Sequence, residues 1–166
     1  MVHVFSQVER EMGPCEIVVF NAAQRYRDSL TNLDPDRVAN AFKTGAFGGF
    51  LVGQAAARAM LPRGQGSIFF TGATASVKGM AQSAPFAMQK FALRGLAQSM
   101  ARELHPRGIH VAHIIIDGRI ASATGSNAGN ATLDPNAIAT AYFDLHRQDK
   151  SAWSTEIDLR PFMETF

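Results

Sequence analysis

The chain has 166 residues, of which 46% are hydrophobic and 18% are charged, and it contains 14 glycines. This length can bury one hydrophobic core, and the composition is that of a globular domain rather than of a disordered or fibrous chain. The formal net charge is only +2, with basic and acidic residues interspersed, which argues against a nucleic-acid-binding surface. The most apolar helical run, 45–53, is too short to span a bilayer, so neither a membrane nor a nucleic acid is an expected partner.

The number of cysteines indicates the redox state of the cellular compartment. Cys15 is the single cysteine, so no internal disulfide can form, as is typical of reducing compartments. Residues 1–12 have the pattern of an amphipathic helix rather than that of a signal peptide, so we expect a cytoplasmic protein. Cys15 follows Gly13-Pro14 and opens an apolar segment, which favours a buried structural thiol over a reactive one.

The chain begins with a predicted helix and a predicted strand. Apolar residues at helical spacing predict the helix over 1–12, and Gly13-Pro14 ends it. Residues 15–20 form an apolar run rich in Val and Ile, which predicts a strand buried on both faces. Asn21-Ala22-Ala23 follows, at the strand end where open α/β sheets bind ligands, although an asparagine there is also a common turn residue.

A long helix is predicted over 36–60, because Asp34-Pro35 supplies an N-cap acid and a proline in the first turn. Within it, Gly45, Gly49 and Gly53 recur at intervals of four and form a smooth stripe on one face. Each glycine costs about 1 kcal/mol of helix stability relative to alanine. The stripe therefore indicates close approach of another backbone, either the sheet of the same chain or a partner subunit.

The segment 66–118 has the pattern of a βαβ unit. Residues 67–71 form a strand, 72–83 a loop, 84–104 a helix with Ser83 in the N-cap position, and 109–116 a second buried strand. Parallel sheets are the usual setting for such a unit.

Three elements are predicted after this unit. Residues 118–133 are rich in Gly, Ser, Asn and Ala and predict a flexible, lid-like loop at the carboxyl end of the sheet. Asp134-Pro135 starts a last helix that ends near His146, and the alternation over 155–159 predicts a final short strand. The aromatic tail, 162–166, is expected to pack back on the core.

No metal site is expected. His110 and His113 lie three apart on a predicted strand, so their side chains point to opposite faces and cannot share one ion. The other histidines have no partner cluster.

Nearly the whole chain resembles the later two-thirds of a short-chain dehydrogenase/reductase. The order of elements is similar, and so are the short sequence motifs at 21–23, at 86–90 and at 117–122. In the last of these, Asp117 stands where the family has proline and Ser122 where it has threonine. The resemblance implies an α/β fold over 1–166: a single, truncated, partial Rossmann-like domain. It would contain a doubly wound parallel sheet of about four strands with flanking helices, without the N-terminal GxxxGxG part.

The resemblance also implies an oxidoreductase that acts on a carbonyl or alcohol with NAD or NADP. In the family, a tyrosine and a lysine four residues later carry the proton chemistry, with a serine thirteen residues earlier and an asparagine in the preceding helix. Here these positions are Phe86, Lys90, Ala73 and Gly45, so only the lysine is retained. The positions that the resemblance assigns to cofactor binding are Asn21, Ala22, Lys90, Ile120 and Ser122.

Two classes of function are open at this point. The first is an oxidoreductase that is impaired or inactive as this chain alone, because its general acid is absent. The alternative is a non-catalytic module that forms a homo-oligomer through helices 36–60 and 84–104, or an incomplete gene product. Tyr26, which follows the first predicted strand, is a candidate for a substitute acid.

Overall fold

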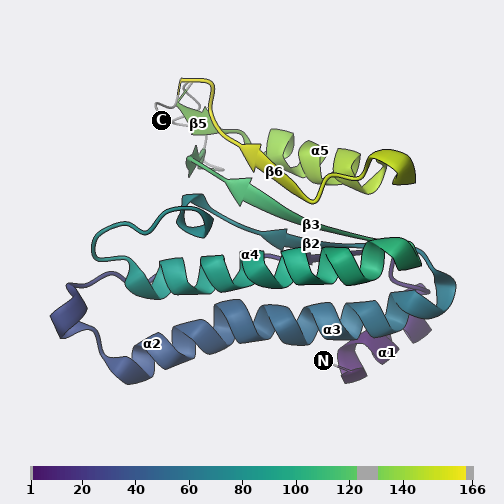
Figure 1. Ribbon diagram of the computed structural model, residues 1–166, viewed down its shortest axis with the longest axis horizontal. Coiled ribbons are helices and arrows are strands. Elements are labelled where there is room, and N and C mark those ends of the chain that lie inside the picture. Colours follow the sequence, from purple (N-terminus) through teal and green to yellow (C-terminus); the bar gives the residue numbers. More distant parts are fainter. Residues whose placement is uncertain (1, 123–130, 164–166) are drawn as a thin grey trace.

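The computed structural model describes residues 2–122 and 131–163. Four parallel strands form one sheet in the order β1-β2-β3-β6, with bounds Ile17–Phe20, Gly66–Thr71, Ile109–Ile116 and Glu156–Leu159. Figure 1 shows α3 and α4 lying side by side beneath the sheet and α5 on the other face. The predicted α/β fold with a four-stranded parallel sheet is therefore confirmed.

The helices lie close to their predicted bounds. They are α1 (Val2–Met12), α2 (Pro35–Phe42), α3 (Gly48–Met60), α4 (Ala84–Leu104) and α5 (Pro135–His146). The carboxylates of Asp34 and Asp134 each accept a hydrogen bond of 2.9 Å from the backbone N–H two residues later, which caps α2 and α5 as predicted. Within the described ranges, no helix is long and apolar enough to cross a bilayer.

Two Pro-Arg-Gly turns bring the chain from α3 into β2 and from α4 into β3. Gly64 and Gly108 end these turns with φ values of +61° and +83°, a left-handed conformation that glycine adopts without strain. A Cβ atom on Gly108 would overlap the carbonyl oxygen of Gly64. The two turns therefore pack directly against each other at the amino ends of β2 and β3.

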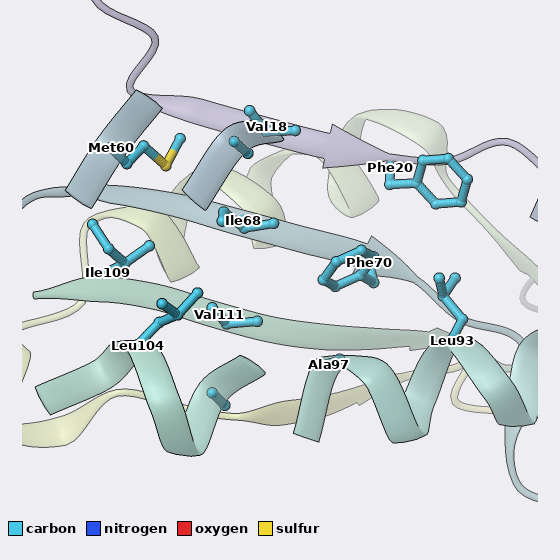
Figure 2. Packing of buried hydrophobic residues seen from close by; sticks show 12 residues of the cluster. Val18, Phe20, Met60, Ile68, Phe70, Leu93, Ala97, Leu104, Ile109 and Val111 are labelled. Atoms are coloured by element: carbon cyan, nitrogen blue, oxygen red, sulfur yellow. The ribbon is translucent and has the colours of Figure 1, made fainter. Parts of the chain in front are cut away.

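The core has one layer on each face of the sheet. Figure 2 shows the layer between the sheet and helices α3 and α4, which contains Val18, Phe20, Met60, Ile68, Phe70, Leu93, Leu104 and Val111. The layer beneath α5 contains Phe69, Ala112, Ile114, Ile116 and Leu145. All eight residues of β3 are buried, because this strand has neighbours on both sides and a helix layer on both faces.

The prediction that the first strand is buried on both faces is wrong. Val18 and Phe20 are buried, but Ile17 and Val19 are 36% and 47% exposed. β1 is an edge strand of the described sheet, and α5 packs over β2, β3 and β6 instead. A run of Val and Ile fits an edge strand as well as a central one.

The helix predicted over 36–60 is interrupted by a π-helical turn, Lys43–Phe47, which separates α2 from α3. Its glycine stripe packs within the chain: a Cβ on Gly49 would overlap Leu93 Cδ1, and a Cβ on Gly53 would lie 3.0 Å from Met100 and Phe70. The sequence left open whether the stripe packs on the sheet of the same chain or on a partner subunit. In the structure it packs on α4 and on the sheet of the same chain.

Other sequence predictions hold only in part. Ser83 occupies the N-cap position of α4 but makes no side-chain cap. Phe162 is 78% exposed, so it does not pack on the core as predicted. Cys15 is only partly buried, so the predicted full burial of its thiol is wrong. The thiol donates a hydrogen bond of 3.3 Å to the carbonyl oxygen of Ile17, and partial burial raises its pKa.

The predicted lid-like loop, 118–133, is structured at both of its ends. Arg119–Ile120 (β4) and Thr132–Leu133 (β5) form a short parallel pair. The rest of the loop, 123–130, lies outside the described residues, as does the end of the aromatic tail, 164–166.

The glycine stripe generates a prediction on stability. Gly49→Ala should lower the free energy of unfolding by about 1–2 kcal/mol, because the overlap with Leu93 outweighs the gain in helix propensity. Gly95→Ala is the matched control. No atom lies within 4 Å of a Cβ at Gly95, so the substitution should stabilise the protein by about 0.5–1 kcal/mol. Urea denaturation followed by circular dichroism measures both changes, and a stabilised Gly49→Ala protein would contradict the packing described.

Candidate active site

A cavity of about 520 Å³ opens at the carboxyl ends of β1, β2 and β3. Its walls are the loop after β1, the turn after β2, the first turns of α4 and the segment that follows β3. In open α/β sheets this edge is where ligands bind. The volume is that of a site for a small molecule.

The structure brings most of the predicted site positions to this cavity. Its described lining includes Asn21, Ala73, Phe86, Lys90 and Ile120. Three other predicted positions are not part of that lining: Gly45, Ala22 and Ser122. Five of the eight predicted positions therefore lie together at one cavity, and the other three are outside its described lining.

Lys90 is buried in the cavity wall, with an exposed fraction of 4%. Its Nζ donates a hydrogen bond of 2.7 Å to the carbonyl oxygen of Thr71 and lies 5.7 Å from the centroid of the Phe86 ring. Burial disfavours the charged form and lowers the pKa of Lys90 to about 8. The lysine is thus in place, but the ring beside it has no proton to exchange.

Gln89 fills the space in front of Gly45. Its fully buried carboxamide donates hydrogen bonds of 2.9 Å to the carbonyl oxygens of Gln24 and Pro85 and accepts one of 3.2 Å from the N–H of Gln24. A Cβ on Gly45 would lie 2.8 Å from Gln89 Cδ and overlap its oxygen. An asparagine therefore does not fit at position 45 while Gln89 keeps this conformation. Sequence reasoning missed Gln89, although a glutamine on the buried face of a helix was a usable signal.

Asp117 is a second residue whose contacts were missed. Thr74 Oγ1 donates a hydrogen bond to its carboxylate, and Arg160 lies 2.8 Å from the other carboxylate oxygen. The side chain is largely buried and lines the cavity. Asp117 thus has two partners within the chain, at the position where the family has proline. This departure from the family motif was the sequence signal that could have drawn attention to Asp117.

A buried network lies behind the turn that contains Ala73. His113 Nε2 lies 3.2 Å from Ser76 Oγ, and His113 Nδ1 lies 3.3 Å from a carboxylate oxygen of Glu156. Arg94 donates two hydrogen bonds of 2.7 Å to the same carboxylate. Burial lowers the pKa of His113 to about 4, so the imidazole is neutral at neutral pH.

The order serine, histidine, glutamate resembles a hydrolytic triad, but its serine faces inward. Ser76 is fully buried, is not part of the described cavity lining, and accepts a hydrogen bond of 3.1 Å from the N–H of Ala73. A nucleophile must reach its substrate. Ser76 therefore holds the 73–76 turn in place.

Neither tyrosine replaces the missing phenol. The Tyr26 hydroxyl accepts a hydrogen bond of 3.4 Å from the N–H of Asp34, and Arg37 lies over its ring at 3.9 Å, away from the cavity. Tyr142 lies in α5, on the other face of the sheet, and pairs with Thr71 Oγ1 at 2.8 Å. Across 2–122 and 131–163, no three metal-ligating side chains cluster, and His110 and His113 point to opposite faces.

Comparison with known proteins identifies the family. The short chain dehydrogenase family matches residues 1–131. A crystal structure of a short-chain dehydrogenase from Rhodopseudomonas palustris is 40% identical, with a TM-score of 0.83, and the match covers 97% of this chain and 69% of that one. The chain therefore belongs to the short-chain dehydrogenase family.

Two further relatives show how far the similarity extends. The 3-oxoacyl-[acyl-carrier-protein] reductase MabA of Mycobacterium avium is 32% identical over 116 residues, which cover 70% of this chain and 45% of that protein. The chain thus spans about half the length of the curated relatives it matches. An alcohol dehydrogenase from Thermococcus sibiricus, complexed with 5-hydroxy-NADP, is 20% identical and has a TM-score of 0.83. The match covers 99% of this chain and 70% of that one, so the two proteins share the fold.

The buried histidine predicts a pH dependence of stability. The unfolded chain binds a proton at His113 below its ordinary pKa of 6.5, whereas the folded chain binds it only below about 4. The neutral His113 therefore contributes up to about 3 kcal/mol to the free energy of unfolding. This contribution is fully present above pH 6.5 and is lost as the pH falls towards 4. The lowered pKa of Glu156 acts in the same direction at more acidic pH.

Urea denaturation between pH 4.5 and 7.5 tests this dependence. In His113→Gln the rise of the unfolding free energy with pH should be flatter than in the wild type. His3→Gln, which replaces an exposed histidine of α1, should keep the wild-type slope. An unchanged slope in His113→Gln would show that other groups carry the dependence.

Proposed function

We propose that this chain forms the substrate and nicotinamide side of an NAD(P)-dependent oxidoreductase site for a carbonyl or alcohol, with impaired proton transfer. One observation carries the proposal: Phe86 lies beside Lys90 in the cavity, at the position of the family's catalytic tyrosine. Membership of the short-chain dehydrogenase family supports the reaction class. In this proposal, residues 1–166 form one partial Rossmann-like unit.

The residues of the cavity suit the nicotinamide end of NAD or NADP. When bound, the nicotinamide ring supplies or accepts a hydride. Lys90 offers an ammonium group that can donate hydrogen bonds to ribose hydroxyls, and Asn21 and Ile120 line the same cavity. The related fold of the Thermococcus sibiricus alcohol dehydrogenase was solved with 5-hydroxy-NADP, which supports a cofactor of this kind.

The described lining has no phenol or serine hydroxyl at the positions where the family places its proton donor. Ala73 and Phe86 have no exchangeable side-chain proton, and Gln89 fills the space at the relay position. The aliphatic hydroxyls of Thr74 and Ser83 are poor acids at neutral pH. A well-placed general acid contributes roughly a hundred- to ten-thousand-fold in rate, so turnover should be low by about that factor.

Restoring the phenol and the serine hydroxyl tests the proposal. The double variant Phe86→Tyr/Ala73→Ser should raise kcat/KM for NADPH-dependent carbonyl reduction at least about a hundred-fold, because a phenol beside Lys90 can give up its proton. Adding Lys90→Met should remove the gain, since the ammonium group no longer lowers the pKa of the phenol. Phe143→Tyr, at an exposed position of α5, is the matched control and should have no effect.

Cofactor binding is measured separately by titration calorimetry with NADPH and NADH. Absence of heat at millimolar cofactor would overturn the proposal for this chain. A double variant no faster than the wild type would show that another step limits the rate.

A second function, assembly of identical chains, is favoured by exposed apolar side chains on α3 and α4. They include Phe50, Leu51, Met88 and Phe91 together with Phe47 of the π turn, whose ring stacks on that of Phe50 at 5.9 Å. An apolar groove between the helices is lined by Phe50, Leu61, Leu96 and Met100. We propose a homo-oligomer through 36–60 and 84–104, because apolar surface of this kind marks interaction sites.

Light scattering after size-exclusion chromatography tests this assembly. The wild type should elute as an oligomer, and Phe50→Ser/Phe91→Ser should raise its dissociation constant at least about tenfold, since buried aromatic side chains often dominate interfaces. Phe143→Ser removes an exposed aromatic from α5 and should leave the mass unchanged. A wild type that stays monomeric at high concentration would exclude the interface.

A further inference from the structure

The cavity has an excess of positive charge that the proposed proton chemistry does not use. Its described lining contains five cationic side chains and one carboxylate: Arg25, Arg27, Lys78, Lys90, Arg160 and Asp117. The sequence of 123–130, ATGSNAGN, adds no ionisable side chain. The whole chain, in contrast, has 16 basic and 14 acidic residues, so positive charge is concentrated at this cavity.

Two of the five cations are held by groups of the protein itself. Arg160 lies 2.8 Å from the carboxylate of Asp117 and 2.6 Å from that of Asp158. Lys90 donates its hydrogen bond to the carbonyl oxygen of Thr71. The single carboxylate of the described lining is therefore already paired and does not neutralise the remaining cations.

Arg25, Arg27 and Lys78 have no carboxylate partner in the part of the chain that the structure describes. Arg27 Nε donates a hydrogen bond of 3.1 Å to Ser83 Oγ, and Arg25 Cζ lies 5.8 Å from the centroid of the Phe86 ring. Both contacts leave guanidinium N–H groups available. Three such cations around one cavity raise the local concentration of anions.

The loop that contains the two arginines is anchored on both sides. At Gln24 both backbone groups are hydrogen-bonded to the carboxamide of Gln89, and at Asp28 the N–H donates to the carbonyl oxygen of Gln82 at 3.2 Å. Gln82 has a φ of +60°, a left-handed conformation that residues other than glycine seldom adopt. Because the loop is anchored beforehand, its backbone needs little further ordering when Arg25 binds a ligand.

We propose that this cavity binds a small carbonyl or alcohol compound that carries a carboxylate or a phosphate group, with Arg25 and Lys78 as the anion-binding side chains. The guanidinium fork of arginine matches the geometry of both anions, and the ammonium of lysine adds a point charge. The Phe86 ring lies beside Arg25 and provides an apolar surface for the rest of the compound. The carbonyl or alcohol part of this inference rests on the proposed function, whereas the anionic part rests on the cavity charges alone.

Matched pairs of compounds test the anionic group without any nicotinamide cofactor. Titration calorimetry would compare 2-oxohexanoate with its methyl ester, and dihydroxyacetone phosphate with dihydroxyacetone. In at least one pair the anionic member should bind at least about tenfold more tightly, and the pair that discriminates identifies carboxylate or phosphate. Added salt should weaken binding of the anionic member only, because screening reduces its attraction to the cavity.

Substitutions then assign the effect to the named side chains. Arg25→Gln/Lys78→Gln should weaken binding of the anionic compound at least about tenfold and leave its neutral partner unchanged. Arg10→Gln, on the exposed surface of α1 outside the cavity, is the matched control and should change neither. Both substituted positions are exposed, so circular dichroism should show a folded protein.

Three results would overturn the inference: equal affinity within both pairs, equal weakening by Arg10→Gln, or equal loss of NADPH affinity in the double variant. The last would show that these cations hold a cofactor phosphate instead. Anion discrimination without cofactor binding would support this site and overturn only the cofactor part of the proposed function.

Discussion

The close contact between the glycine-lined helix and α4 is the constraint on which the rest of the site depends. Side chains are absent at Gly45, Gly49 and Gly53, so α4 approaches near enough for Gln89 and Leu93 to fill the space between the helices. This position of α4 over β2 brings Lys90 to the carbonyl oxygen of Thr71. The helix pair therefore sets the geometry of the cavity, although most of it lies outside the cavity wall.

The features that the sequence predicts well are local ones. Asp34 and Asp134 cap their helices with bonds to residues two positions away, and Ala73, Phe86 and Lys90, which the family resemblance singled out, line one cavity. The π turn was not predicted, because its glycine and small residues fit a regular helix equally well. Burial of β1 was overestimated because its Val and Ile residues do not tell an edge strand from a central one.

The polar contacts of the site were not predictable, because their partners are far apart in the chain. Gln24 and Gln89 are separated by 65 positions, and His113 and Glu156 by 43. A glutamine or histidine on a buried face can be recognised in the sequence, but only the fold shows which polar group it meets. Asp117 was noticed as a departure from the family, but the pairing with Arg160 needed β6 to be placed beside β3.

The contact between the Gly64 and Gly108 turns lies far from the cavity. It lies at the amino ends of β2 and β3, whereas the cavity lies at the carboxyl ends of the same strands. Residues that hold the strands in register are thus at the opposite edge of the sheet from those that meet a ligand. Substitutions at 73 and 86 can therefore change the cavity wall while the two turns, and with them the strand register, stay as they are.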